Sequence, residues 1–312
     1  MRQHIAMQQS GDAFYFIANY HSLTSVRDAD VLRQNTLDVV LDYLALGLDP
    51  AQCTLYLQSD LPQTTELAWI LGTVTPVSSM EKGVSYKDKI ANGLSPNIGL
   101  FTYPILQAAD ILIVHADLVP VGEDQKQNIE IARDLSQRLN HYYGDGLLRQ
   151  PEESILKSVA VVPGTDGRKM SKSYGNTIPI FARGKELKKR VMSIETDSTP
   201  LESPKDPETC NVFALIRLFA AEEKREEIAA KYREGGYGYG HAKKELLGMM
   251  TEYFAPAAER RDELAKDLDY VRDILREGAK KAQERAESVM EPVRSATGLI
   301  RTSMQNTNQS LL

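Results

Sequence analysis

The first half of the chain alternates short apolar runs with stretches of helical periodicity. Residues 13–18 (AFYFIA) and 53–57 (CTLYL) are rich in β-branched and aromatic side chains and predict two buried strands. Between them, residues 31–48 predict an amphipathic helix that ends at Gly47. Its apolar positions near one face are Leu32, Leu37, Val40 and Leu44. Strands and helices that alternate in this way are typical of a parallel, doubly wound sheet, whose ligands bind at the carboxyl ends of the strands.

The pattern changes after about residue 180. A further strand is predicted over residues 158–162 (SVAVV), and beyond it the chain is rich in Glu, Lys, Ala and Leu with no convincing strand. Helical periodicity covers residues 184–194, 207–233, 241–257 and 260–291, with a loop-rich bridge at 196–208. We therefore expect an α/β fold: a doubly wound parallel, Rossmann-like sheet over 1–180, an all-α domain over 181–300, and a disordered tail over 301–312.

Composition narrows the class of protein. The 312 residues are 42% hydrophobic and 26% charged, as in soluble globular proteins. We expect a cytoplasmic protein that does not enter a membrane, because no apolar run approaches the roughly 20 residues of a span and the N-terminus lacks the apolar region of a signal peptide. Cys53 and Cys210 form no CxxC pair, which argues against a zinc ribbon or a disulfide framework.

The net charge of −6 is unlike that of a general nucleic-acid binder. However, whole-chain charge governs only non-specific attraction, and a local basic patch can hold a phosphate backbone. One such cluster consists of Lys185, Lys188, Lys189 and Arg190. It is either an exposed helix face or an RNA contact, and the pattern leaves both interpretations open.

The most informative segment is residues 164–176 (GTDGRKMSKSYGN). Lys169 and Lys172 lie three apart, alternate with serines, and follow a Gly/Asp turn, which predicts a mobile, cationic loop. Such a loop suits the polyphosphate of ATP, where positive charge and small donors must follow oxygens that move during the reaction. The alternative is a solvated surface turn.

Polar groups also follow the short apolar run of residues 119–121. The sequence continues as GEDQKQN over residues 122–128, so a glycine is followed at once by two carboxylates and then by amide side chains. Gly122 would let the backbone approach a ligand, and the side chains could accept hydrogen bonds from ribose hydroxyls and an α-ammonium group. The alternative is a helix start with acidic residues in its first turn.

A third candidate site lies in residues 102–110 (TYPILQAAD). Pro104 suits the first position of a helix, on which Tyr103, Gln107 and Asp110 would lie on nearly one face. Asp110 stands in an apolar stretch, where a carboxylate is costly unless it is partnered. Its partner would be the indole N–H or phenol O–H of a bound amino acid, or an internal donor.

These segments together resemble the tryptophanyl-tRNA synthetase family, from Phe14 to about Arg301. Residues 169–173 (KMSKS) are similar to the second signature of class I aminoacyl-tRNA synthetases, and GEDQKQN separates the chain from the tyrosyl enzymes. Further matching segments are residues 32–50, 56–71 and 236–246 (GYGYGHAKKEL).

The resemblance implies a role for each matching residue. Asp110 would accept the indole N–H, and the other residues around the amino acid would be Tyr103, Gln107, Gln125, His21, Val119 and Val121. The catalytic cations that grip the pyrophosphate would be Lys169, Lys172 and Lys89. The rest of the nucleotide site would consist of Met170, Ser171, Ser173, Gly122, Asp124 and Val161. No protein metal site is implied, since Mg²⁺ would arrive with ATP.

The implied reaction has two steps: activation of L-tryptophan by ATP, then transfer to tRNA(Trp). The family also implies a homodimer with tRNA across both subunits, and a helical half that reads the anticodon. Two alternatives remain open. Gln107 resembles the tyrosyl enzymes, which makes tyrosine the second candidate substrate, and a noncatalytic nucleotide- or tryptophan-binding paralogue is a different class of protein.

One departure from the family pattern is serious. The first class I signature, a His-x-Gly-His or His-x-Gly-Asn turn within PxSGxxHxGN, has no counterpart here. We therefore expect the first strand and half of the ATP site to be absent, which leaves the activity of the chain open. Either the start is set at an internal methionine of a gene encoding roughly 20 more residues, which we favour, or a truncated form exists.

Overall fold

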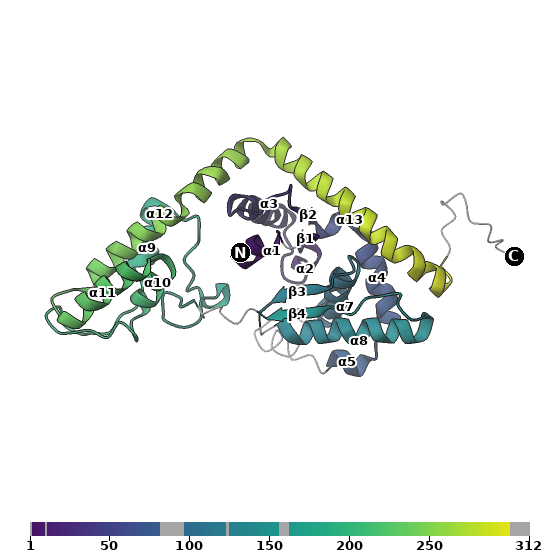
Figure 1. Ribbon diagram of the computed structural model, residues 1–312, viewed down its shortest axis with the longest axis horizontal. Helices are drawn as coiled ribbons and strands as arrows, with labels where there is room; N and C mark the ends of the chain where they lie inside the picture. Colours follow the sequence, from purple (N-terminus) through teal and green to yellow (C-terminus); the bar gives the residue numbers. More distant parts are fainter. Residues whose placement is uncertain (1, 10, 82–96, 123–124, 156–161, 300–312) are drawn as a thin grey trace. The chain divides into compact units, whose positions relative to one another are not determined.

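The computed structural model describes residues 2–9, 11–81, 97–122, 125–155 and 162–299 (Figure 1). The chain divides into two compact units. The first contains residues 1–157 and 264–312, and the second contains residues 158–263. The predicted fold class, parallel strands with helices followed by a helical part, is confirmed.

The first unit contains two pairs of parallel strands. β1 (Ala13–Ile17) pairs with β2 (Cys53–Leu57), and β3 (Leu118–Val121) pairs with β4 (Glu152–Ile155). The two strands predicted at residues 13 and 53 are thus confirmed. The pattern did not reveal β3 and β4, since each is four residues long and β3 contains a proline. Most of the strand predicted over 158–162 lies outside the described residues.

One edge of β1 and one edge of β3 line the same cavity, of about 660 Å³. Residues 13–16 and 117–120 are consecutive in its wall, whereas the face of a strand would contribute alternate residues. Among the described strands, β1 pairs only with β2, and β3 pairs only with β4. The β1–β2 and β3–β4 pairs therefore do not join into one described sheet.

Helices enclose these strands. In the first unit they are α1 (Arg2–Met7), α2 (Asn19–Ser22), α3 (Ala29–Ala45), α4 (Pro62–Thr73), α5 (Val77–Glu81), α7 (Ile98–Leu112), α8 (Lys126–Tyr143) and α13 (Leu268–Thr297), with a 3₁₀ turn η1 (Gln58–Asp60). The helix predicted over 31–48 begins two residues earlier, because the Asp28 side chain accepts hydrogen bonds from the N–H groups of Asp30 and Val31.

The prediction that Pro104 begins a helix is wrong. α7 begins at Ile98, where the Asn97 side chain accepts a hydrogen bond of 2.9 Å from the N–H of Leu100, and Pro104 lies inside the helix. A proline inside a helix removes one backbone hydrogen bond and crowds the preceding turn. The apolar side chains that α7 buries compensate for this cost, namely Leu100, Ile105, Ala108, Ala109 and Leu112.

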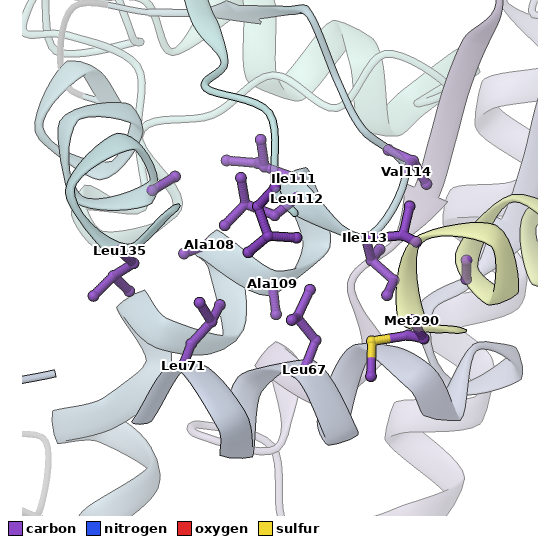
Figure 2. Close-up of a cluster of buried hydrophobic side chains, with 14 of the residues drawn as sticks. Leu67, Leu71, Ala108, Ala109, Ile111, Leu112, Ile113, Val114, Leu135 and Met290 are labelled. Atoms are coloured by element: carbon purple, nitrogen blue, oxygen red, sulfur yellow. The ribbon is translucent and has the colours of Figure 1, made fainter. Parts of the chain in front are cut away.

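The core of the first unit lies between α4, α7, α8 and α13. Figure 2 shows Leu67 and Leu71 of α4 facing Ala108 and Ala109 of α7, with Met290 of α13 beside them. α13 is also fixed to α4 by Arg294, which is 5% exposed and donates hydrogen bonds of 2.6 and 2.7 Å to the carboxylate of Glu66. This helix is therefore part of the first core.

The second unit is helical. It contains α9 (Gly184–Met192), α10 (Asn211–Phe219), α11 (Glu222–Glu234) and most of α12 (Tyr239–Lys266), and its core includes Val212, Phe213, Ile216, Ile228, Tyr232 and Leu246. The helix predicted over 207–233 is two helices, since Ala220 is extended. The break predicted between 257 and 260 falls instead at Asp267, whose side chain caps α13.

The limits of these units differ from the boundary predicted near residue 180. Val162 and Met170, which precede that boundary, pack against the helical core of the second unit. α13, which follows it, packs against β2 and α4 of the first unit. The change in sequence character at residue 180 reflects the loss of strands, whereas the units are set by which helices share a core.

Gly278 brings α13 close to the backbone of β2. A Cβ atom at this position would lie 1.8 Å from the carbonyl oxygen of Leu55, so the helix or the strand would have to move. Gly278→Ala should therefore lower the free energy of unfolding by about 1–3 kcal/mol, measured by urea denaturation. Gly72→Ala in α4 is the matched control, because nothing lies within 4 Å of its Cβ position. Equal effects of the two substitutions would contradict this account.

Candidate functional site

Asp110 is the centre of a buried polar cluster in the first unit. It is 4% exposed, and three hydrogen bonds hold its carboxylate. His21 Nε2 lies 2.8 Å from Oδ2, and Gln58 Nε2 donates to Oδ1 and Oδ2 at 2.8 and 2.9 Å. The sequence left two kinds of partner open for Asp110, a bound amino acid or an internal donor. The structure shows internal donors.

The strand topology explains why these three residues meet. His21 lies in α2, directly after β1, and Gln58 directly follows β2. Because β1 and β2 are parallel, their carboxyl ends lie at the same edge. α7 brings Asp110 to that edge from a third segment. The cluster therefore occupies the position where an α/β sheet of this kind binds its ligands.

The pKa of Asp110 reflects two opposed effects. Burial raises the pKa of this carboxyl above its usual value, while the hydrogen bond and the charge of His21, and the hydrogen bond from Gln58, act to lower it. Burial also raises the pKa of the neighbouring Tyr56 phenol, and the Asp110 carboxylate raises it further. Tyr56 therefore stays neutral, and the hydrogen bonds from His21 and Gln58 are what favour the charged form of Asp110 against the effect of burial.

Gln58 is the site residue that the sequence interpretation missed. Its segment was recognised only as part of a matching stretch, and a glutamine carries no charge pattern that attracts attention. A signal was nevertheless present, because Gln58 is the first residue after a predicted parallel strand.

Other residues that were predicted to surround the bound amino acid lie near this cluster or are linked to each other. The rings of His21 and Tyr103 meet edge to face with centroids 6.3 Å apart. Gln107 Nε2 donates to Gln125 Oε1 at 3.4 Å, and Gln125 also accepts 2.8 Å from Asn128 Nδ2. Tyr103, Gln107 and Gln125 are all partly buried.

The remaining predicted residues of the first unit divide into two groups. Val119 and Val121 lie on β3 and pack against the hydrophobic core, while the exposed Gly122 follows that strand. Two other candidates, Lys89 and Asp124, lie outside the described residues, as does Val161 of the second unit.

The lysine-containing loop belongs to the second unit and is organised by Asn176. This side chain, 2% exposed, donates to Asp166 Oδ1 at 2.7 Å and to the carbonyl of Lys169 at 3.2 Å. Its Oδ1 accepts from the N–H of Ser171 at 2.8 Å. A Cβ on Gly164 would lie 2.2 Å from Asn176 Nδ2, so only glycine fits there. The predicted loop therefore has a fixed base.

Exposure distinguishes the cationic side chains of this loop from the methionine between them. Lys169 and Lys172 are both exposed, whereas Met170 between them packs against the helical core. Ser173 lies in a 3₁₀ turn, η3 (Lys172–Tyr174). Exposed lysines on either side of a partly buried methionine leave both ammonium groups available to an anionic ligand. Lys169 and Lys172 belong to the second unit, whereas Asp110 belongs to the first. That these lysines and Asp110 serve one site stays a prediction.

The described residues contain neither a metal-binding cluster nor a membrane-spanning helix. No group of three or more His, Cys, Asp and Glu side chains there is placed to hold a metal ion. Of the helices that the structure describes, none combines the length and the apolar character that a membrane span needs. Cys53 and Cys210 are both buried and free.

Asn176→Ala should loosen the loop without unfolding the unit. The substitution leaves buried loop groups without partners, so we expect cleavage by trypsin after Arg168, Lys169 or Lys172 to accelerate about tenfold. The measurement is the initial cleavage rate at these sites by mass spectrometry. Asn140→Ala removes two hydrogen bonds to Leu148 in the first unit, and this control should leave loop cleavage unchanged. An equal acceleration in both variants would refute the role of Asn176.

Comparisons with known proteins agree with this geometry. Residues 1–255 match the family described as tRNA synthetases class I (W and Y). Tryptophan--tRNA ligases from Fusobacterium nucleatum and Rhodopirellula baltica are 53% and 50% identical to the chain, across 96% of it and 92% and 93% of the relatives. The crystal structure of tryptophanyl-tRNA synthetase from Campylobacter jejuni complexed with ADP and tryptophan is 46% identical, with a TM-score of 0.92 over 96% of this chain and 93% of that one. The chain therefore belongs to the class I tRNA synthetases for tryptophan and tyrosine, and within them to the tryptophanyl-tRNA synthetases.

Proposed function

We propose that this chain activates L-tryptophan with ATP and transfers the tryptophanyl group to tRNA(Trp). The observation that carries the proposal is the buried Asp110 carboxylate at the carboxyl ends of β1 and β2. An ionised carboxylate can accept about four hydrogen bonds, and Oδ1 of Asp110 accepts one from Gln58. Oδ1 can therefore accept a further hydrogen bond from an indole N–H. Relatives that are 53% and 50% identical and carry the name tryptophan--tRNA ligase support the same substrate.

The amino-acid pocket would be completed by the residues beside Asp110. Tyr103 offers a partly buried ring, and Gln107 and Gln125 offer amides linked to one another. An aromatic ring can stack on or meet the indole edge, while the amides can accept hydrogen bonds from the α-ammonium group. Val119 and Val121 would form apolar walls at the end of β3.

In the first step the tryptophan carboxylate attacks the α-phosphorus of ATP in line. A bond forms between a carboxylate oxygen and that phosphorus, and the bond to the β-phosphate oxygen breaks, releasing pyrophosphate. The protein supplies position and charge neutralisation, with little covalent chemistry of its own. Lys169, Lys172 and Lys89 would neutralise the departing pyrophosphate. Mg²⁺ would enter bound to the ATP phosphates, where it shields their charge.

In the second step a terminal ribose hydroxyl of tRNA(Trp) attacks the acyl carbon, loses its proton and displaces AMP. The basic cluster on α9 is one candidate RNA contact, since Lys185, Lys188 and Lys189 are exposed while Leu187 and Val191 are buried. A homodimer in the cytoplasm, with tRNA lying across both subunits and the helical residues reading the anticodon, completes the proposal.

Tryptophan-dependent exchange between ATP and pyrophosphate tests this function. Exchange that requires L-tryptophan supports it. Exchange with L-tyrosine would favour the tyrosyl alternative, for which Gln107 is the specific observation. Tryptophan or nucleotide binding without exchange would favour a noncatalytic paralogue.

Lys172→Ala should separate catalysis from substrate binding. If this ammonium group stabilises charge only in the transition state, kcat of the exchange reaction should fall about a hundredfold with little change in the KM for tryptophan. Lys188→Ala, an exposed lysine on α9, is the control and should leave exchange unchanged. An equal loss of kcat and of tryptophan affinity in Lys172→Ala would contradict the assigned role.

A further inference from the structure

Gln58 connects three segments of the first unit through one side chain. The residue is 1% exposed. Its Oε1 accepts from the N–H groups of Tyr20 and His21 at 3.0 and 3.4 Å, and its Nε2 donates to both oxygens of Asp110. The same carboxamide thus joins the end of β2, the turn after β1, and α7.

The surroundings determine the orientation of this carboxamide. Rotating it by half a turn would place Oε1 against the two carboxylate oxygens of Asp110 and Nε2 against two N–H donors. Every one of the four hydrogen bonds would become a repulsive contact. The arrangement is therefore a specific one, in which the acceptor end faces the backbone of α2 and the donor end faces Asp110.

A second pair of side chains keeps Gln58 in register with α2. Asn19 Nδ2 donates to Ser59 Oγ at 2.7 Å, and Asn19 Oδ1 accepts from the N–H of Ser59 at 3.0 Å. This pair ties the ends of β1 and β2 together, and Gln58 extends the connection to Asp110. His21, which is held at its N–H by Gln58, then closes the cluster through its ring.

We infer that Gln58 is a positioning residue for recognition of the indole N–H: it fixes the Asp110 carboxylate and the His21 segment relative to each other, so that Asp110 presents an acceptor to the substrate ring. The inference rests on the proposed function. It adds the residue that lets the site distinguish a ring with an N–H group from a ring without one. Gln58 acts through Asp110 and His21, with no contact to the substrate of its own.

The pKa of Asp110 distinguishes a positioning role of Gln58 from a purely packing role, because a loss of packing alone would leave this pKa unchanged. The groups around Asp110 are His21 from α2, Gln58 and Tyr56 from the β2 segment, and Tyr103 of α7, whose ring meets that of His21. The hydrogen bond from Gln58 acts to lower the pKa of Asp110. Without this hydrogen bond the pKa of Asp110 rises. As the pH is lowered, Asp110 is therefore protonated at a higher pH, and binding of the indole weakens from that pH downward.

The test is equilibrium binding of L-tryptophan and of β-(3-benzothienyl)alanine, which has sulfur in place of the ring N–H. Isothermal titration calorimetry over a range of pH gives Kd for both ligands without requiring turnover. The variants are Gln58→Met, which keeps the size and removes both polar ends, and Gln58→Glu. Gln52→Met is the matched control, because Gln52 Nε2 also donates 2.8 Å to an aspartate, Asp49, but at an exposed position.

In Gln58→Met, the preference for tryptophan over the sulfur analogue should fall about tenfold, the order of one lost charge-assisted hydrogen bond. The acid limit of tryptophan binding, meaning the pH below which binding weakens, should move to a higher value. Gln58→Glu places two carboxylates together, which then share one proton. Tryptophan binding by this variant should weaken as pH rises, opposite to the unsubstituted chain. Gln52→Met should change none of these quantities.

Different outcomes separate this inference from the proposed function. If the unsubstituted chain binds tryptophan and Gln58→Met keeps both its preference and its acid limit, the positioning role is wrong. If Gln58→Met unfolds, as a melting curve would reveal, the direction of the pH dependence in Gln58→Glu decides in its place. If the unsubstituted chain fails to bind tryptophan, the proposed function and this inference are both overturned.

Discussion

A carboxylate that is buried must be given hydrogen-bond donors, and the first unit supplies them to Asp110 from two segments distant in the sequence. His21 and Gln58 come from the ends of two parallel strands, and Asp110 comes from a helix that follows them in the chain. Desolvation opposes the charge, and the donors oppose desolvation. Under the proposed function the amino-acid site depends on this balance, because the same carboxylate would have to stay an acceptor for a ligand.

Much of this arrangement was predictable from the sequence. The strands at residues 13 and 53 follow from runs of β-branched and aromatic residues, and Asp110 draws attention as an acidic residue in an apolar stretch. The contact between Gln58 and Asp110 was harder to predict, because the two residues are 52 apart in the sequence and Gln58 carries no charge. Its position directly after a predicted strand was the one available signal. Local pattern also misplaced the start of α7, since an asparagine cap and a buried face outweighed the usual preference of proline for a first turn.

The lysine-containing loop shows a second limit of local reasoning. Its composition predicts a mobile, cationic segment, and the structure shows that both of its lysines are exposed. The side chain that fixes its base, Asn176, lies at the end of the same motif, but its three hydrogen bonds depend on how the loop folds back on itself. A predicted domain boundary near residue 180 likewise followed the change in composition, whereas the units follow shared cores.

The return of α13 to the first unit has a consequence for biosynthesis. Residues 268–297 cover the backbone of β2 and the apolar face of α4, although they are made after the whole second unit. At about 5–20 residues per second, the ribosome adds the whole second unit before it supplies this helix. Until then the nascent first unit cannot close its core, and Leu67 and its neighbours stay open to water. The second unit, contiguous in the chain, can complete its own core first.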